Sequence, residues 1–132
     1  MHPPTTPTIT LKVTRIQELS LKNVVPKAAS GGNVQMKLAS GGHLHPEDKK
    51  QARVFLNSEL TYSDLRLRIV TESFFENSEG FTEDDMNPES GLKKLINIAW
   101  KEHLSFVRFL VEGAGYEISR YPESLEEFDR VQ

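Results

Sequence analysis

The stretch Gly91–Gly113, GLKKLINIAWKEHLSFVRFLVEG, constrains the fold more than any other part of this sequence. Its apolar residues recur at helical spacing, which predicts one long α-helix. A surface helix usually buries a stripe a little over about 100° wide, whereas the apolar arc here covers about 240°. We therefore expect two partners for the helix, the protein's own sheet and a second copy. The main stripe is Leu92, Leu95, Ile96, Ala99, Phe106, Val107 and Leu110, with Trp100, Leu104 and Val111 on one flank and Ile98 and Phe109 on the other.

Length and composition limit the class of protein. A chain of 132 residues is sized for a single domain, which we place at residues 9–132 after a flexible arm at residues 1–8. A net charge of −3 argues against nucleic acid as a partner, and the absence of cysteine excludes disulfides, thiolate catalysis and cysteine zinc sites. Neither a signal peptide nor a membrane-spanning run is recognisable, so we expect a cytoplasmic protein with no membrane insertion.

Alternation of apolar and polar residues predicts four strands before the helix. The first covers residues 9–21, where changes of phase indicate bulges or a kink. The second covers residues 34–38, and residues 39–50, with two glycines and a proline, are predicted to form a solvated loop. Residues 54–60 and 67–73 form an antiparallel hairpin with its turn at residues 63–64.

The connections around the helix carry their own signals. An acidic, glycine-containing loop precedes it, and Asn87 followed by Pro88 is typical of an N-cap and a first helical position. After the helix, Ser124 and Glu127 form a capping box for a short last helix. Strands followed by helices favour the α+β class, with an antiparallel sheet covered on one face and open on the other.

Several aromatic side chains exceed what one small core needs. Phe74 and Phe75 are adjacent in a strand, so they point to opposite faces, and the following loop carries Phe81. Homo-oligomerisation alone could account for the surplus apolar surface. Alternatively, the helix flanks are used for assembly, and the aromatic residues at the strand end line a groove for another chain.

No catalytic set can be assembled from the sequence. His43, His45, Glu47 and Asp48 have metal-ligand chemistry, but no third ligand is recognisable by spacing, and a solvated polar loop is the favoured interpretation. His103 lies within the apolar stripe and is interpreted as a core or interface histidine, because nothing positions a nucleophile beside it. We therefore predict no enzyme, no metal and no cofactor, and keep a metal enzyme using His43 and His45 as a minor alternative.

The order of elements resembles that of the SecB export chaperones. In the first strand, Arg15-Ile16 and Glu18-Leu19-Ser20-Leu21 are similar to the family's opening strand, and Tyr121-Pro122 to Phe128 is similar to its closing segment. The similarity covers about residues 9–128, as a pattern without a signature motif. It implies a four-stranded antiparallel sheet followed by one long and one short helix, assembled as a dimer of dimers (a homotetramer) through the first strands and the long helices.

The resemblance also implies a function. SecB proteins use no cofactor; they hold unfolded chains in apolar grooves and pass exported precursors to the SecA translocase motor. This chain departs from the family in being much less acidic and in stopping at Gln132 just after the last helix, which leaves coupling to SecA and protein transport open. SecB-like proteins also serve as dedicated chaperones of antitoxins.

We therefore expect a homo-oligomeric holdase, a chaperone that binds unfolded or extended polypeptides. An oligomeric interaction or scaffold protein, or a dedicated chaperone for one partner such as an antitoxin, is the alternative. Groove residues implied by the family lie on and after the fourth strand, where a slip of one residue would exchange the two faces. The candidates are Leu67, Ile69, Phe74, Phe75 and Phe81 for the groove and Ile16, Trp100, Leu104 and Phe109 for the oligomer interface.

Overall fold

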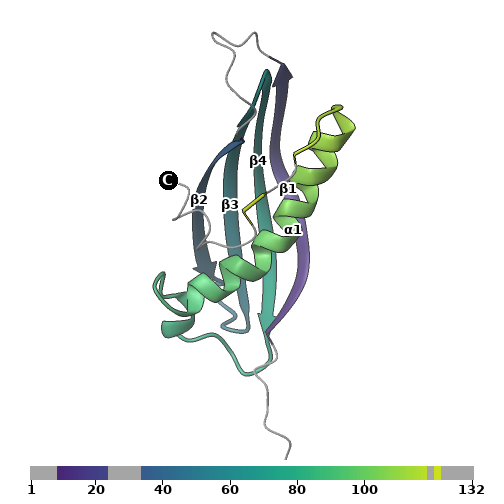
Figure 1. Ribbon diagram of the computed structural model, residues 1–132. Helices are drawn as coiled ribbons and strands as arrows, with labels where there is room; N and C mark the ends of the chain where they lie inside the picture. Colours follow the sequence, from purple (N-terminus) through teal and green to yellow (C-terminus); the bar gives the residue numbers. More distant parts are fainter. Residues whose placement is uncertain (1–8, 24–33, 119–120, 123–132) are drawn as a thin grey trace, which may run out of the picture.

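The computed structural model describes residues 9–23, 34–118 and 121–122. Figure 1 shows one sheet of long strands crossed by a single long helix. The order of elements confirms the predicted α+β class, with four antiparallel strands followed by a long helix. The elements are β1 (Ile9–Asn23), β2 (Gln35–Leu44), β3 (Gln51–Tyr62), β4 (Leu65–Asn77), the 3₁₀ turn η1 (Asp84–Met86) and α1 (Gly91–Gly113).

The strands lie in the order β1-β4-β3-β2, and every neighbouring pair is antiparallel. β3 and β4 form the predicted hairpin, and its two-residue turn holds Ser63 at φ 54°, in the left-handed region that tight hairpin turns require. β1 pairs with β4 with register shifts between Leu11 and Val13 and between Ile16 and Glu18. These bulges confirm the interruptions predicted from the changes of phase in this strand.

The helix α1 covers one face of the sheet and lies diagonally across it (Figure 1). Alternate residues of β3 and β4 point to the helix and are buried, because period-two alternation sends every second side chain to the same face. This layer of apolar side chains is the core of the protein. Its largest fully buried members include Trp100, Phe75, Leu56, Leu60, Leu65, Ile69 and Leu95.

Two local predictions were wrong. β2 continues to Leu44, through residues predicted to be a loop, because Gly41 and Gly42 pair in register with Phe55 and Val54 of β3. A side chain at Gly42 would meet the Leu92 side chain at 2.5 Å, so glycine lets α1 approach the sheet. Asn87 is not the N-cap of α1, because that position is Ser90; the Asn87 side chain instead accepts a hydrogen bond from the Glu89 backbone N–H at 2.9 Å.

The predicted arm at residues 1–8 and the short last helix after Ser124 lie outside the described residues. Within the described part of the chain, no helix has the length and apolar character needed to cross a membrane.

Candidate functional site

A buried polar cluster joins the helix to the middle of the sheet. His103 of α1 forms hydrogen bonds through Nε2 with the Ser58 hydroxyl of β3, at 2.6 Å, and through Nδ1 with the Thr71 hydroxyl of β4, at 2.7 Å. All three residues are buried, and burial lowers the pKa of His103 from 6.5 to about 4. A neutral imidazole offers one donor and one acceptor, which two hydroxyl groups can satisfy. The geometry therefore confirms His103 as a core histidine.

Four of the five predicted groove residues are core residues in the structure. Leu67, Ile69 and Phe75 point from β4 towards α1, and Phe81 folds back from the loop after β4; each is at most 3% exposed. The expectation that they line an accessible groove therefore does not match their position in the single chain. Phe74 is the exception, because it lies on the opposite face of β4 and is partly exposed.

Two of the predicted interface residues are also buried. Trp100 is fully buried, stacks on the His103 ring with centroids 5.2 Å apart and donates a hydrogen bond from Nε1 to the Pro122 carbonyl at 2.8 Å. Leu104 is 6% exposed. The helix flank that was expected to meet a second copy is covered instead by the protein's own sheet and by residues 121–122. No sequence pattern indicates that this segment returns to the helix.

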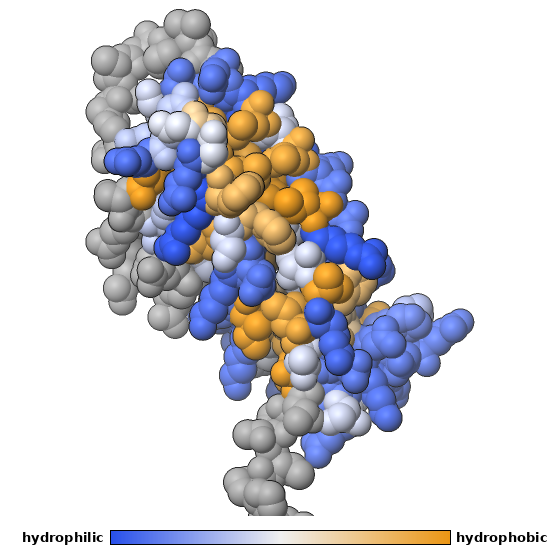
Figure 2. Space-filling view, turned by 90° about the vertical axis from the view of Figure 1, so that its right-hand side faces the viewer, coloured by the Kyte–Doolittle hydropathy of each residue, from blue (hydrophilic) through white to orange (hydrophobic). Residues whose placement is uncertain are grey.

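A second group of apolar residues is exposed where β1 and α1 lie side by side. Ile16, Leu19 and Leu21 of β1 are 41%, 48% and 42% exposed, and Phe109 of α1 is 77% exposed. The three β1 residues pair with Thr71, Ile69 and Leu67, so they belong to the helix side of the sheet. We call these four residues, Ile16, Leu19, Leu21 and Phe109, the edge surface. Figure 2 faces this side of the molecule and shows apolar side chains gathered on it.

The backbone beside the edge surface is also available. β1 is an outer strand of the four-stranded sheet and pairs with β4 on one side only among the described residues. Its other side presents a row of N–H and C=O groups over a strand of 15 residues. A long edge strand with apolar side chains is a template for pairing with another chain. Ile16 and Phe109, both predicted interface residues, lie at this position.

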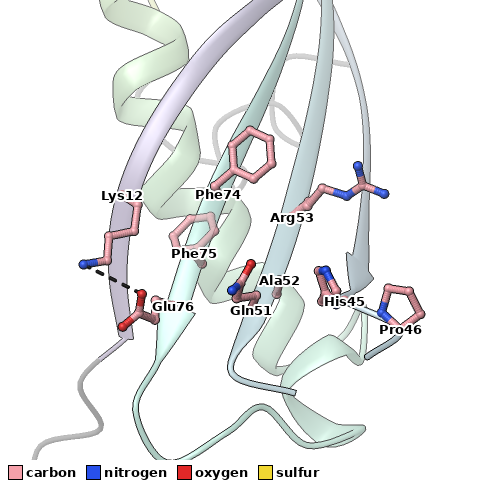
Figure 3. A pocket seen from close by; sticks show the side chains of 9 residues that line it. All are labelled: Lys12, His45, Pro46, Gln51, Ala52, Arg53, Phe74, Phe75 and Glu76. Atoms are coloured by element: carbon pink, nitrogen blue, oxygen red, sulfur yellow. Dashed lines mark ion pairs between the residues drawn. The ribbon is translucent and has the colours of Figure 1, made fainter. Parts of the chain in front are cut away.

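The face of the sheet opposite α1 carries a hollow of about 500 Å³ (Figure 3). Phe74 lines it from β4 and Arg53 from β3, while Lys12 and His45 lie on either side of them. We call this cavity the open-face hollow. Its complete lining is Lys12, His45, Pro46, Gln51, Ala52, Arg53, Phe74, Phe75 and Glu76, of which Ala52 and Phe75 have side chains that belong to the core on the helix side.

Charged groups surround the aromatic side chain of the hollow. The Arg15 guanidinium lies over the Phe74 ring, 5.3 Å from its centroid. Lys12 Nζ is 3.8 Å from a carboxylate oxygen of Glu76, and Arg53 Nη1 is 3.6 Å from one of Glu72. The hollow therefore combines an accessible aromatic ring with cations at its rim.

The histidines of the predicted loop show no metal-site geometry. The His43 ring contacts the Phe55 ring edge to face, with centroids 5.6 Å apart. His45 Nδ1 accepts hydrogen bonds from the backbone N–H groups of Glu47 and Asp48, each at 3.1 Å. Across the residues that the structure describes, no three His, Cys, Asp or Glu side chains are grouped so as to hold a metal ion.

The sequence matches no protein-family profile and no curated protein. The structure is similar to that of a SecB-like chaperone of Mycobacterium tuberculosis in complex with a ChAD peptide from an antitoxin, with a TM-score of 0.58. The match covers 86% of this chain and 92% of the mycobacterial one, at 15% sequence identity. The chain has a SecB-like fold. The resemblance predicted from the pattern of the first strand and the order of the elements is confirmed at the level of the fold.

The residues of β1 that carry the resemblance are divided between the two faces of the sheet. Arg15 and Glu18 of β1 point to the open face, where Glu18 accepts a hydrogen bond from Arg68 of β4 at 2.9 Å. Leu19 and Leu21 of the same strand lie on the edge surface. One strand thus contributes to both the open face and the edge surface.

Proposed function

We propose that this protein is a homo-oligomeric holdase, without enzymatic activity, that binds unfolded or extended polypeptide segments in the cytoplasm. The observation that carries the proposal is the exposed apolar surface along an outer strand of a SecB-like fold. An unpaired strand edge with apolar side chains is a template for pairing with another chain, and contiguous exposed apolar surface marks sites of protein interaction. In our proposal the two surfaces have different roles: the edge surface binds a second copy, and the open-face hollow binds the client.

The edge surface fits a second copy because it offers both backbone and side-chain contacts. Antiparallel pairing of two β1 strands would extend the sheet, and the apolar residues beside the strand would be buried at the same time. Burying an apolar side chain contributes about 1.5–3 kcal/mol, so a symmetric contact that covers Leu19 and Phe109 of both copies is substantial. A carboxylate in place of Leu19 or Phe109 should prevent this contact between copies.

The solution mass tests the assembly. Light scattering after size exclusion should give a dimer or larger oligomer for the wild type and a monomer for Leu19→Glu and Phe109→Glu. Both residues are exposed in the single chain, so the monomer should keep its far-ultraviolet spectrum. Gln35→Glu is the matched control, because it adds the same charge to the exposed outer strand at the opposite edge of the sheet. Loss of the oligomer in this control as well would contradict the assignment.

The open-face hollow fits a client because it contains Phe74, the predicted groove residue that remains accessible. An extended segment laid across the open face would place alternate side chains on the sheet, with one of them against the Phe74 ring. The mycobacterial structure of the same fold also holds a peptide. That similarity supports polypeptide as the class of ligand.

Suppression of aggregation tests the holdase function. An aggregation-prone protein diluted from denaturant should scatter much less light when the oligomer is present in equal amount. Phe74→Glu should weaken this protection while leaving the solution mass unchanged, whereas Thr61→Glu, on the same face near the β3–β4 turn, should leave both unchanged. Undiminished aggregation in the presence of the wild-type oligomer would refute the proposed function.

A dedicated chaperone for one partner, such as an antitoxin, is the second candidate. It is favoured by the mycobacterial structure, in which the bound peptide comes from an antitoxin. The two candidates differ in their selectivity. Protection of one client only, among several unrelated aggregation-prone proteins, would favour the dedicated chaperone over the general holdase.

A further inference from the structure

The open face of the sheet differs in charge from the rest of the protein. The register of the four strands assigns six lysine and arginine side chains and four glutamates to this face, and Lys12, in the first bulge of β1, joins them through its ion pair with Glu76; the net charge is +3, although the whole chain carries −3. The cations are Lys12, Arg15, Lys22, Lys37, Arg53, Arg66 and Arg68, and the glutamates are Glu18, Glu59, Glu72 and Glu76.

We infer that the open-face hollow selects acidic polypeptide segments, in which carboxylates flank an apolar side chain. The inference rests on the proposed function, because it names the chemistry of the client that the hollow would hold. The two groups it relies on are the Phe74 ring and the cations that surround it, Arg15, Arg53 and Lys12. Each of the three is exposed on the surface that an incoming chain would meet.

The central carboxylate of the open face is turned inward, whereas its cation is turned outward. The Glu72 side chain is 10% exposed, and that of its partner Arg53 is 48% exposed. Glu72 pairs across the strands with Arg15, whose guanidinium covers Phe74. An approaching segment therefore meets two guanidinium groups before it meets the carboxylate beneath them, and the potential it experiences favours negative charge.

The cations at the rim of the hollow can still form closer contacts. The Arg53–Glu72 and Lys12–Glu76 separations, 3.6 and 3.8 Å, are longer than charge-assisted hydrogen bonds, which measure about 2.7–2.9 Å. A client carboxylate can approach the outer side of Arg53 or Lys12 to that distance. Two such contacts on either side of a buried aromatic contact would fix an extended segment over the hollow.

The spacing of charges on the open face favours polypeptide over nucleic acid. Glutamate stands beside cations in two rows across the sheet, Arg15–Glu72 and Arg68–Glu59–Lys37, so a continuous phosphate backbone would pass over carboxylates as well as over cations. An extended polypeptide places side chains on one face at intervals of about 7 Å, so its carboxylates can meet the cations and avoid the glutamates. The hollow supplies the apolar contact between them.

Binding of three fluorescent peptides tests the inference. They have equal length and the same phenylalanines, and differ only in carrying glutamate, glutamine or lysine between them. Fluorescence anisotropy should show the glutamate peptide binding about tenfold more tightly than the glutamine peptide, a difference of about 1.4 kcal/mol, and the lysine peptide binding most weakly. Equal binding of all three would overturn the inference and leave the proposed function standing. If none of the three peptides binds, the result counts against both the inference and the proposed function.

A pair of variants locates the selectivity. Lys12→Gln combined with Arg53→Gln removes two positive charges from the hollow and should abolish the preference for the glutamate peptide. The control, Lys94→Gln combined with Lys101→Gln, removes the same charge from exposed positions on α1 and should keep the preference. Equal loss in both would show that net charge alone is responsible and would overturn the inference.

Two further measurements separate selectivity for acidic peptides from a loss of stability in the variant and from binding of nucleic acid. If the Lys12 and Arg53 variant melts at a lower temperature than the control, Arg15→Gln provides a second removal of charge beside Phe74, with the same expected loss of preference. A fluorescent oligothymidylate should bind more weakly than the glutamate peptide. Tighter binding of the oligothymidylate would assign the open face to single-stranded nucleic acid and overturn the inference.

Discussion

Protonation of His103 should weaken the fold as the pH falls. The imidazole is buried, and its two nitrogens form hydrogen bonds with Ser58 and Thr71 in the centre of the core. Burial lowers its pKa from 6.5 to about 4, so the unfolded chain binds a proton at a pH where the folded chain does not. The stability contributed by the neutral ring is complete above pH 6.5 and is lost as the pH falls from 6.5 towards 4.

The size of this effect follows from the two pKa values. A pKa of about 4 in the folded state and 6.5 in the unfolded state gives a loss of about 2 kcal/mol between about pH 7.5 and pH 5. Carboxylates also begin to titrate near pH 5, so the wild type must be compared with His103→Gln, in which this contribution is absent. The variant will be less stable at both pH values, because its amide replaces a ring that packs on Trp100.

Denaturant unfolding at the two pH values provides the measurement. At a fixed protein concentration, the free energy of unfolding of the wild type should fall by about 2 kcal/mol more than that of His103→Gln. The fixed concentration matters because an oligomer's stability depends on it. Equal losses in the two proteins would refute the reasoning, since they would place the titrating groups elsewhere.

One single substitution and two pairs of substitutions test the packing of the core, each by thermal or denaturant unfolding. Trp100→Ala should lower the free energy of unfolding by about 3–5 kcal/mol, because the indole ring is fully buried. A smaller loss would contradict the place of Trp100 in the core. Phe75→Ala should lower the free energy of unfolding by about as much, because Phe75 is buried, and Phe74→Ala should lower it by less than half of that amount. A larger loss for Phe74→Ala than for Phe75→Ala would contradict the assignment of Phe75 to the core and of Phe74 to the open face. Gly91→Ala should lower the free energy of unfolding by about 1–3 kcal/mol, because the added Cβ would meet the backbone of η1. Gly113→Ala should not destabilise the protein, because a Cβ there would lie in open space. Equal effects of the two substitutions would contradict the close approach of Gly91 to η1.

The sequence predicts the elements of this fold well because periodicity is a local property. The long helix, the hairpin of β3 and β4 and the presence of bulges in β1 all follow from the spacing of apolar residues, whereas the predicted N-cap of the helix was wrong. β2 was predicted too short, because Gly41 and Gly42 are turn signals when read locally. Pairing with β3 overrides that signal, and the close approach of α1 requires the small residue at Gly42.

The candidate site was predicted less well because burial depends on contacts that are distant in the sequence. Adjacent phenylalanines must point to opposite faces, but only the structure shows that Phe75 enters the core and Phe74 does not. Trp100 has the helical position of a flank residue and is covered by residues 121–122, which follow it after the helix has ended. The cations around Phe74 of β4 come from β1 and β3, and no short stretch of the sequence contains Arg53 together with Lys12 and Arg15.

Native mass spectrometry of the purified protein with a permanently unfolded client, such as a reduced and carboxymethylated protein, tests the central claim most directly. It reports the assembly and the complex with polypeptide in one spectrum. We expect an oligomer of this chain alone and an oligomer with bound client when the unfolded protein is added. A monomer that acquires no client would contradict both the edge surface as a contact between copies and the proposed holdase function.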